Sequence, residues 1–245
     1  MKYDFTTLLN RQGHDALALD VLPIKDVEID PNFSKIPMWV ADMNFPACPT
    51  IAESIIERVN HPTYGYFEPR EEYFDSIIQW HKTRNHVEGL EKKHIGYENG
   101  VLGGVISALN VLASKGDNVL LNSPTYIGFT HALENNGYNM VLSPLKLDEN
   151  NVWRMDYEDM EKKIVENHIH VAIICSPYNP CGRVWEKEEL EKAVALFEKH
   201  NVWIVSDEIW SDIILDGNKH IPTQSVNAYA RTHTAAMYAP SKTFN

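Results

Sequence analysis

The sequence predicts an α/β protein in which a mostly parallel β-sheet is covered by helices on both faces. From residue 94 onward, short apolar runs alternate with longer segments whose apolar residues recur at helical spacing. The apolar runs are nearly continuous, which is typical of strands buried on both faces of a parallel sheet. The chain has 245 residues, of which 44% are hydrophobic, so it is large enough to bury the core of such a domain.

The beginning of the chain is expected to form an arm rather than part of the sheet. It shows no sustained periodicity and contains Pro23, Pro31 and Pro37. We therefore expect an N-terminal arm over residues 1–45, followed by one large domain over residues 46–245.

The elements of the domain follow in order from the apolar pattern. Apolar residues three and four positions apart predict helices, and short apolar runs between turns predict strands. The predicted helices cover residues 49–59, 71–85, 101–113, 124–137, 157–167 and 186–200. The predicted strands cover residues 94–97, 118–122, 140–142, 170–176, 202–206 and 234–238.

Charge and cysteine content exclude several classes of function. With 22 Lys and Arg against 34 Asp and Glu, the net charge is −12, which excludes a general nucleic-acid binder and disfavours anionic membranes. The 3 cysteines have no paired spacing, so we expect reduced thiols and no metal site. The sequence contains no apolar run of transmembrane length and no signal peptide, so we expect a cytoplasmic protein.

Unusual residues lie where the predicted strands end, which is where ligands of open α/β sheets bind. A glycine-rich turn over residues 99–104 leads into a helix, and Tyr126, Asn179, Asp207 and Lys242 come after later strands. Taken singly, these features have ordinary explanations. The turn can be a plain tight turn, Tyr126 a packed ring, Asn179 part of an Asn-Pro turn, and Asp207 a helix cap.

Together these residues supply the parts of a site for pyridoxal 5′-phosphate (PLP). The glycine-rich turn offers backbone amides to a phosphate, Tyr126 offers a flat ring, and Asn179 an amide donor. Asp207 offers a carboxylate for the pyridine nitrogen, and Lys242 an amine for covalent attachment. The dinucleotide motif G-x-G-x-x-G is not found, which disfavours a Rossmann dehydrogenase.

Several motifs in order along the chain resemble the fold-type I PLP enzymes of the class I/II aminotransferase superfamily. They are Ser-Pro-Tyr-Asn-Pro-Cys-Gly-Arg-Val-Trp at 176–185, Ser-Asp-Glu-Ile at 206–209, and Ser-Lys-Thr-Phe-Asn at 241–245. Within that superfamily, the Gly-Arg-Val-Trp part of the first motif, Trp-Val-Ala-Asp-Met-Asn-Phe at 39–45 and Tyr-Gly-Tyr at 64–66 resemble the MalY/PatB-type cystathionine β-lyases.

The resemblance implies roles for individual residues. Lys242 matches the lysine that binds PLP covalently and acts as the catalytic base, and Asp207 matches the partner of the pyridine nitrogen. Asn179 matches the donor to the hydroxyl oxygen of the pyridine ring, and Tyr126 the ring that stacks on the cofactor.

Further positions match the phosphate site of the family. Val101 and Leu102 correspond to the backbone amides that meet the phosphate. Tyr64 corresponds to a tyrosine that reaches the phosphate of the neighbouring subunit, which implies a homodimer with shared active sites. Ala239 stands where many relatives have a phosphate-binding serine, and Ser241 is expected to compensate.

Three other positions depart from the pattern of the superfamily. Trp210 replaces the usual Tyr or His, so a second contact to the cofactor oxygen is not expected from it. Tyr178 and Cys181 replace commoner residues around Asn179, at the entrance where substrate preference is often set.

The resemblance also implies the fold and the activity. We expect the large domain of a fold-type I PLP enzyme after its arm, incomplete at its C-terminal end and with the small domain missing, so that this chain alone lacks turnover. The implied reaction is β-elimination of a sulfur amino acid to a thiol, pyruvate and ammonia. A class I/II aminotransferase is the alternative, and an inactive fragment or an interaction protein that keeps the fold is a second alternative.

Overall fold

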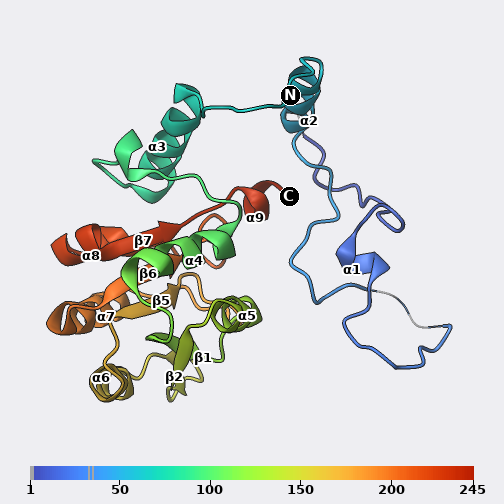
Figure 1. Cartoon of the computed structure of the whole chain (residues 1–245). Coiled ribbons are helices and arrows are strands. Elements are labelled where there is room, and N and C mark those ends of the chain that lie inside the picture. The colour runs from blue at the N-terminus through green and yellow to red at the C-terminus, as the bar shows by residue number, and fades with distance from the viewer. Residues whose placement is uncertain (1–2, 33, 35) are drawn as a thin grey trace. The chain divides into compact units, whose positions relative to one another are not determined.

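The structure is a computed structural model that describes residues 3–32, 34 and 36–245 (Figure 1). The chain divides into two compact units. The first unit comprises Met1–Glu68 with Pro240–Asn245, and the second comprises Pro69–Ala239. The limits expected for an arm and a domain at residues 45 and 46 stay a prediction.

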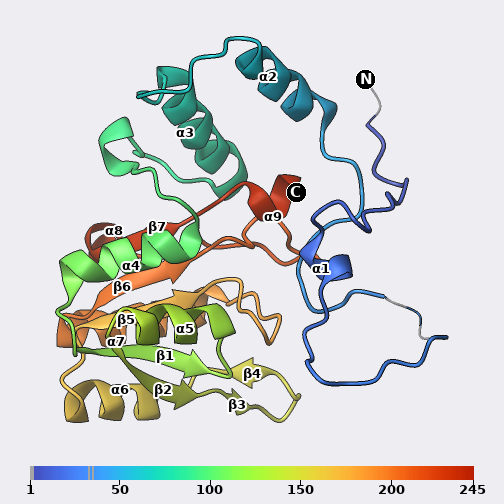
Figure 2. The same cartoon turned by 45° about the vertical axis from the view of Figure 1, so that its right-hand side comes forward.

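A five-stranded parallel sheet forms the centre of the second unit, in the order β2-β1-β5-β6-β7. Its strands are β1 (Asn118–Ser123), β2 (Asn139–Pro144), β5 (Val171–Cys175), β6 (Trp203–Asp207) and β7 (Thr234–Met237). Because they run in the same direction, their carboxyl ends share one edge of the sheet (Figure 2). Every residue of the central strand β5 is buried, as expected for a strand covered on both faces.

Helices cover both faces of this sheet, so the predicted fold class is confirmed. On one face α4 (Val101–Leu112) contacts α5 (Ile127–Asn135). On the other, α7 (Lys187–His200) contacts both α6 (Tyr157–Glu166) and α8 (Ala228–His233). Figure 1 shows α5 and α7 on opposite sides of β5.

Large apolar side chains from the strands and both helix layers form the core of the second unit. Full burial of one such side chain stabilises the fold by roughly 1.5–3 kcal/mol. The fully buried set includes Phe129, Leu120, Leu121, Leu190, Phe197 and Ile204.

Among the residues that the structure describes, the remaining α-helices comprise α3 (Glu71–Asn85) in the second unit and three in the first. These three are α1 (Leu17–Asp20), α2 (Pro49–Val59) and α9 (Ser241–Phe244). The helices predicted over 49–59 and 71–85 are confirmed to the residue. Proline at the first position of α2 lacks an N–H that the helix could not have bonded in any case.

The strand predicted over residues 94–97 is wrong. A short 3₁₀ helix, η1 (Lys92–His94), ends there, and residues 95–97 are in no strand. The reason is local: the carboxylate of Glu91 and the ring of His94 bond backbone N–H groups reciprocally, which stabilises a turn instead of an extended strand.

Several short elements were not predicted from the sequence. Besides α1, α8 and α9, they comprise η2 (Thr223–Ser225) and an antiparallel pair, β3 (Lys146–Leu147) with β4 (Trp153–Arg154). Elements this short show no periodicity over the windows that sequence analysis needs.

Candidate functional site

The order of the sheet reverses between β1 and β5. The strand that follows β1 pairs on one of its sides, and the later strands β5, β6 and β7 extend from the other. In open α/β sheets, such a reversal opens a crevice for ligands beyond the carboxyl ends of the strands. The loops that begin with Pro124 and Ser176 leave the sheet at this point, and the hydroxyl of Tyr178 donates to the carbonyl oxygen of Pro124 at 2.8 Å.

The ring of Tyr126 packs directly on Gly128. A Cβ atom at Gly128 would lie 2.3 Å from Cε1 of Tyr126 and 3.0 Å from Cδ1 of Leu102, so no larger residue fits without movement of the ring. Tyr126 also contacts Phe129 edge to face, with ring centroids 5.5 Å apart. The structure therefore brings Tyr126 and Leu102, two of the predicted site residues, into one neighbourhood.

The N-terminus of α4 carries Val101 and Leu102. Gly100 precedes it with φ +83°, a left-handed conformation that glycine adopts without strain. The first backbone bond of this helix runs from the N–H of Gly104 to the carbonyl of Gly100, so the amides of Val101 and Leu102 lie in the turn whose N–H groups are free of intrahelical bonds. Such a turn favours an anion.

Asp207 lies at the end of β6 and is 4% exposed. Its backbone pairs in register with Cys175 on one side and Met237 on the other, and its carbonyl accepts a bond from the N–H of Ser176 at 2.9 Å. Its Oδ1 accepts from the N–H of Ile209 at 3.1 Å. Residues 208–222 contain no α-helix, so the interpretation of Asp207 as a helix cap is wrong.

The loop that carries Asn179 is held to the end of β5. The N–H of Asn179 lies 3.4 Å from Sγ of Cys175, and the indole N–H of Trp185 donates to the carbonyl of Cys175 at 2.8 Å. Tyr178 bonds the carbonyl of Arg183 through its N–H at 2.7 Å. Burial raises the pKa values of the Cys175 thiol and the Tyr178 phenol, so both stay protonated.

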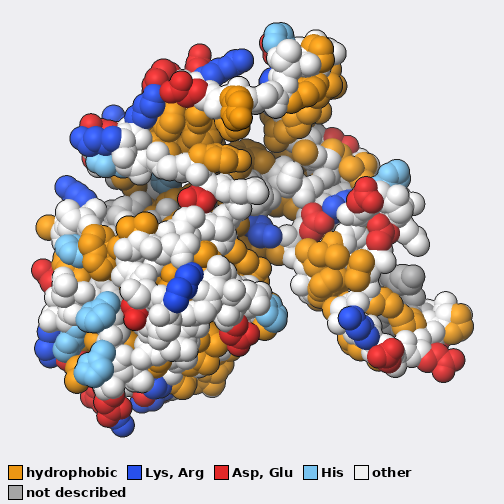
Figure 3. Space-filling view, in the orientation of Figure 1, with side chains coloured by type: hydrophobic (Ala, Val, Ile, Leu, Met, Phe, Trp, Pro, Cys, Tyr) orange, Lys and Arg blue, Asp and Glu red, His pale blue; other side chains and the backbone are white. Residues whose placement is uncertain are grey.

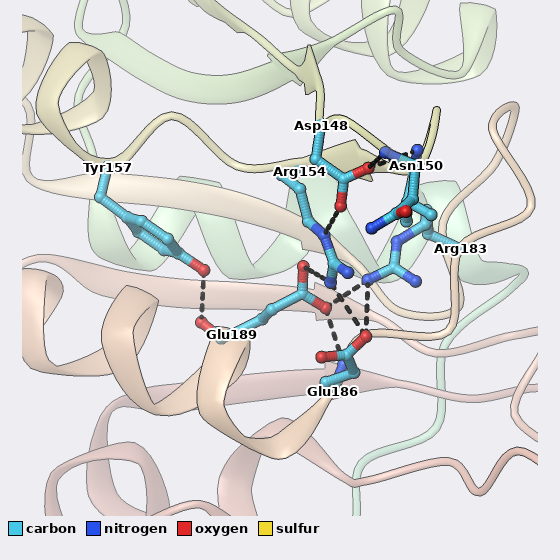
Figure 4. Close-up of polar contacts among 8 residues, drawn as sticks. Asp148, Asn150, Arg154, Tyr157, Arg183, Glu186 and Glu189 are labelled. Atoms are coloured by element: carbon cyan, nitrogen blue, oxygen red, sulfur yellow. Dashed lines mark hydrogen bonds and ion pairs between the residues drawn. The ribbon is translucent and has the colours of Figure 1, made fainter.

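A network of ion pairs fastens the far end of the same loop (Figure 4). Arg183 pairs with Glu189 of α7, and Nη1 of Arg154 reaches Glu189 at 3.0 Å and Glu186 at 2.9 Å. Nε of Arg154 also bonds Asp148 at 2.9 Å. The loop is thus tied both to α7 and to the turn between β3 and β4.

An open pocket of about 330 Å³ adjoins Asn179. Trp210, which follows Asp207 by three positions, lies on its wall with Ile213 and Leu215. The other lining residues are Pro177, Tyr178, Pro180, Gly182, Val184, Asp216 and Asn218.

Lys242, Ser241 and Tyr64 belong to the first unit, and their contacts are described within that unit. Nζ of Lys242 donates to the carbonyl oxygen of Ala41 at 3.0 Å, and Ser241 is the first residue of α9. Tyr64 is 65% exposed and its hydroxyl donates to the carbonyl of Val59 at 3.0 Å. Lys242 follows Met237, the last residue of β7, by five positions.

The sequence analysis missed two residues of this region. Gly128 leaves room for the ring of Tyr126, which packs on it. The only sign of this contact in the sequence was a glycine two positions after the aromatic residue. Glu208 is fully buried beside Asp207, and a second carboxylate after an apolar strand was the signal.

In the part of the chain that the structure describes, no three His, Cys, Asp or Glu side chains are grouped to hold a metal ion. No helix among those residues has the length and apolar character needed to cross a membrane.

The family model described as aminotransferase class I and II matches residues 35–245. The cystathionine β-lyase PatB of Bacillus subtilis is 37% identical over 210 residues, which are 86% of this chain and 54% of PatB.

Several solved structures match the whole chain. The crystal structure of cystalysin from Treponema denticola, which contains pyridoxal 5′-phosphate, has a TM-score of 0.90 at 31% identity. That of a PLP-bound putative aminotransferase from Clostridium difficile has a TM-score of 0.88 at 35% identity. The chain covers 61% of each, so it spans little more than half the length of the relatives it matches.

Proposed function

Because the chain belongs to the class I and II aminotransferase family, we propose that it binds PLP at the carboxyl ends of β1, β5 and β6 and serves a carbon–sulfur β-lyase. The observation that carries this proposal is the position of the buried Asp207 at the carboxyl end of β6, the strand next to β5. A buried carboxylate there suits the protonated ring nitrogen of PLP.

The residues of the second unit fit the rest of the cofactor. The first-turn amides of Val101 and Leu102 suit the phosphate, since a helix N-terminus favours an anion. The ring of Tyr126, seated on Gly128, suits a flat contact with the pyridine ring. The side-chain amide of Asn179 suits the hydroxyl oxygen of that ring.

Lys242 is proposed as the covalent attachment point and as the base that removes the α-proton of the amino acid. When bound, PLP supplies the electron sink that makes this proton acidic. Asp207 keeps a proton on the pyridine nitrogen, and Lys242 takes the proton from Cα, so that the sulfur substituent leaves from Cβ as a thiolate. Hydrolysis of the remaining fragment gives pyruvate and ammonia.

The lyase reaction is preferred because the resemblance to PatB extends over 86% of the chain at 37% identity. An aminotransferase is the second candidate, which the likeness to the putative aminotransferase of Clostridium difficile favours. To decide, the purified protein is incubated with PLP and cystathionine, and pyruvate is measured with and without an added 2-oxo acid. Pyruvate formed without the acceptor supports the lyase. Amino-group transfer without pyruvate supports the aminotransferase, and neither reaction supports an inactive or interaction protein.

We further propose a homodimer in which Tyr64 reaches the phosphate of the neighbouring subunit and Ser241 contacts the phosphate of its own. Three apolar side chains of α2, Ile55, Ile56 and Val59, are each more than half exposed, and Figure 3 shows hydrophobic side chains gathered over this helix. A second copy of the chain would cover them. Sedimentation of the protein at several concentrations tests the dimer, and the cytoplasmic location stays a prediction.

A further inference from the structure

A second carboxylate lies buried immediately after Asp207. Glu208 has no exposed surface, and each of its oxygens accepts two hydrogen bonds. Oε1 accepts from the hydroxyl of Ser206 at 2.8 Å and from the N–H of Thr223 at 2.9 Å. Oε2 accepts from Nε2 of His220 at 2.7 Å and from the hydroxyl of Tyr238.

The donors keep this carboxylate charged. Burial alone would raise the pKa of Glu208, but the contacts from His220, Tyr238 and Thr223 hold it below its usual range. Burial and the nearby carboxylate raise the pKa of Tyr238, so its phenol stays protonated and donates. A buried anion with four donors is satisfied only while every donor keeps its place.

Through these bonds Glu208 joins the end of β6 to three segments that follow it. Thr223 belongs to η2, His220 precedes it in the loop, and Tyr238 comes directly after β7. The N–H of Glu208 also donates to the carbonyl of Met237 at 2.9 Å, and the ring of His81 from α3 packs on Tyr238 at 4.3 Å between centroids.

Asp207 lies between two residues of this cluster, Ser206 and Glu208. Its backbone position is therefore set by the same bonds that fix the end of β7. The chain that leaves Tyr238 reaches Lys242 four residues later. The bonds of Glu208 thus connect the end of β6, which carries Asp207, to the end of β7.

We propose that Glu208 is a positioning residue of the cofactor site, which holds the carboxylate of Asp207 in place and fixes the start of the segment that leads to Lys242. Glu208 itself is placed outside the contacts with cofactor and substrate. The proposal rests on the proposed binding of PLP. It gives the hydrogen bonds of Glu208 a role in cofactor binding in addition to their role in holding the fold together.

The test compares E208Q with the unaltered protein, both loaded with PLP. Glutamine has the same shape but only one accepting oxygen, so its NH₂ group faces two donors and displaces them. We expect the affinity for PLP to fall by about tenfold, since small misplacements of binding groups are costly. The pH midpoint of the visible absorption of bound PLP should shift as well, because the contact of Asp207 with the ring nitrogen changes.

Two further variants separate positioning from general loss of stability. V194A truncates a fully buried side chain of α7 outside the cluster, and should lower the melting temperature while leaving the absorption midpoint unchanged. Y238F removes one donor to Glu208. It should shift the absorption midpoint in the same direction as E208Q does. If E208Q does not fold, the comparison of Y238F with V194A decides the test.

The outcomes distinguish the two proposals. If the unaltered protein fails to bind PLP, the proposed function fails and this inference with it. If the unaltered protein binds PLP, and E208Q and Y238F match it in affinity and absorption midpoint, or change no more than V194A does, then only the positioning role of Glu208 is overturned.

Discussion

Nζ of Lys242 donates a hydrogen bond to the carbonyl oxygen of Ala41 at 3.0 Å, across 201 positions of sequence. Asn245 strengthens the same connection, because its side chain accepts from the N–H of Met43 at 3.3 Å and donates to its carbonyl at 3.2 Å. Arg11 in turn bonds the carbonyl of Met43 at 2.7 Å. Two of the motifs that resemble the family, at 39–45 and 241–245, are therefore neighbours within the first unit.

In a form of the protein that turns over cystathionine, replacing Asp207 with Asn should abolish most of that turnover while the fold survives. The amide has nearly the same shape but no charge, so it cannot keep a proton on the pyridine nitrogen. Loss of that interaction should raise the barrier by several kcal/mol and lower kcat by about a thousandfold or more. Steady-state kinetics and circular dichroism of the Asp207→Asn variant check this. Turnover near that of the unaltered protein would reduce Asp207 to a structural role.

The G128A variant should weaken PLP binding. The added methyl group would stand 2.3 Å from Cε1 of Tyr126, so the ring must move from its seat. We expect the affinity for PLP, measured by titration of its absorbance, to fall by about tenfold or more, because the contact face is displaced. The control is G96A, at an exposed site with open space around its Cβ. Equal affinities in the two variants would show that the ring of Tyr126 does not bind the cofactor.

Removing the carboxylate of Glu189 should destabilise the second unit. The side chains of Glu189 and Arg183 are only 9% and 15% exposed, so Glu189→Ala leaves two cations without their buried partner. We expect the free energy of unfolding to fall by about 2–3 kcal/mol. In contrast, Glu166→Ala breaks an exposed pair with Lys162 and should cost no more than about 0.5 kcal/mol. Urea unfolding of both variants measures the difference. Similar losses of unfolding free energy would show that the buried ion pairs of Glu189 contribute no more to stability than an exposed pair does.

Stability should fall as the pH drops below about 6.5 because of His81. Burial lowers the pKa of His81 despite the nearby carboxylates of Glu208 and Asp212, and His220 lowers it further. Below the ordinary histidine pKa the unfolded chain binds a proton that the folded chain does not, so the unfolded state gains stability, by at most about 1.4 kcal/mol per pH unit.

Urea unfolding at several pH values between 7.5 and 5.5 measures this effect. His81→Phe keeps a ring against Tyr238 but has no group to titrate. The variant should show a shallower dependence of unfolding free energy on pH than the unaltered protein. Parallel curves would show that His81 binds its proton equally in both states.

Long elements were predictable from the sequence because their pattern repeats. The helices at 49–59 and 71–85 were predicted to the residue, and the five strands of the sheet within a few positions. The strand predicted at 94–97 failed because Glu91 and His94 bond the backbone locally, which an apolar pattern cannot reveal.

The residue types of the candidate site could be predicted from the sequence, but the residues that hold them in position could not. Strand ends pointed to Tyr126, Asn179 and Asp207, since parallel strands bring their carboxyl ends to one edge. The seat that Gly128 provides for Tyr126 depends on close contact in three dimensions. The role of Glu208 depends on four donors, of which Ser206 is two positions away and the other three are 12, 15 and 30 positions away, and no spacing rule connects these donors.

The most direct test of the account is the location of the covalent attachment. The protein loaded with PLP is reduced with borohydride, digested and mapped by mass spectrometry, with Lys242→Ala as the control. The account predicts a pyridoxyl label on Lys242 and no label in the variant. A label on another lysine, or none on a folded protein, would contradict the proposed cofactor site.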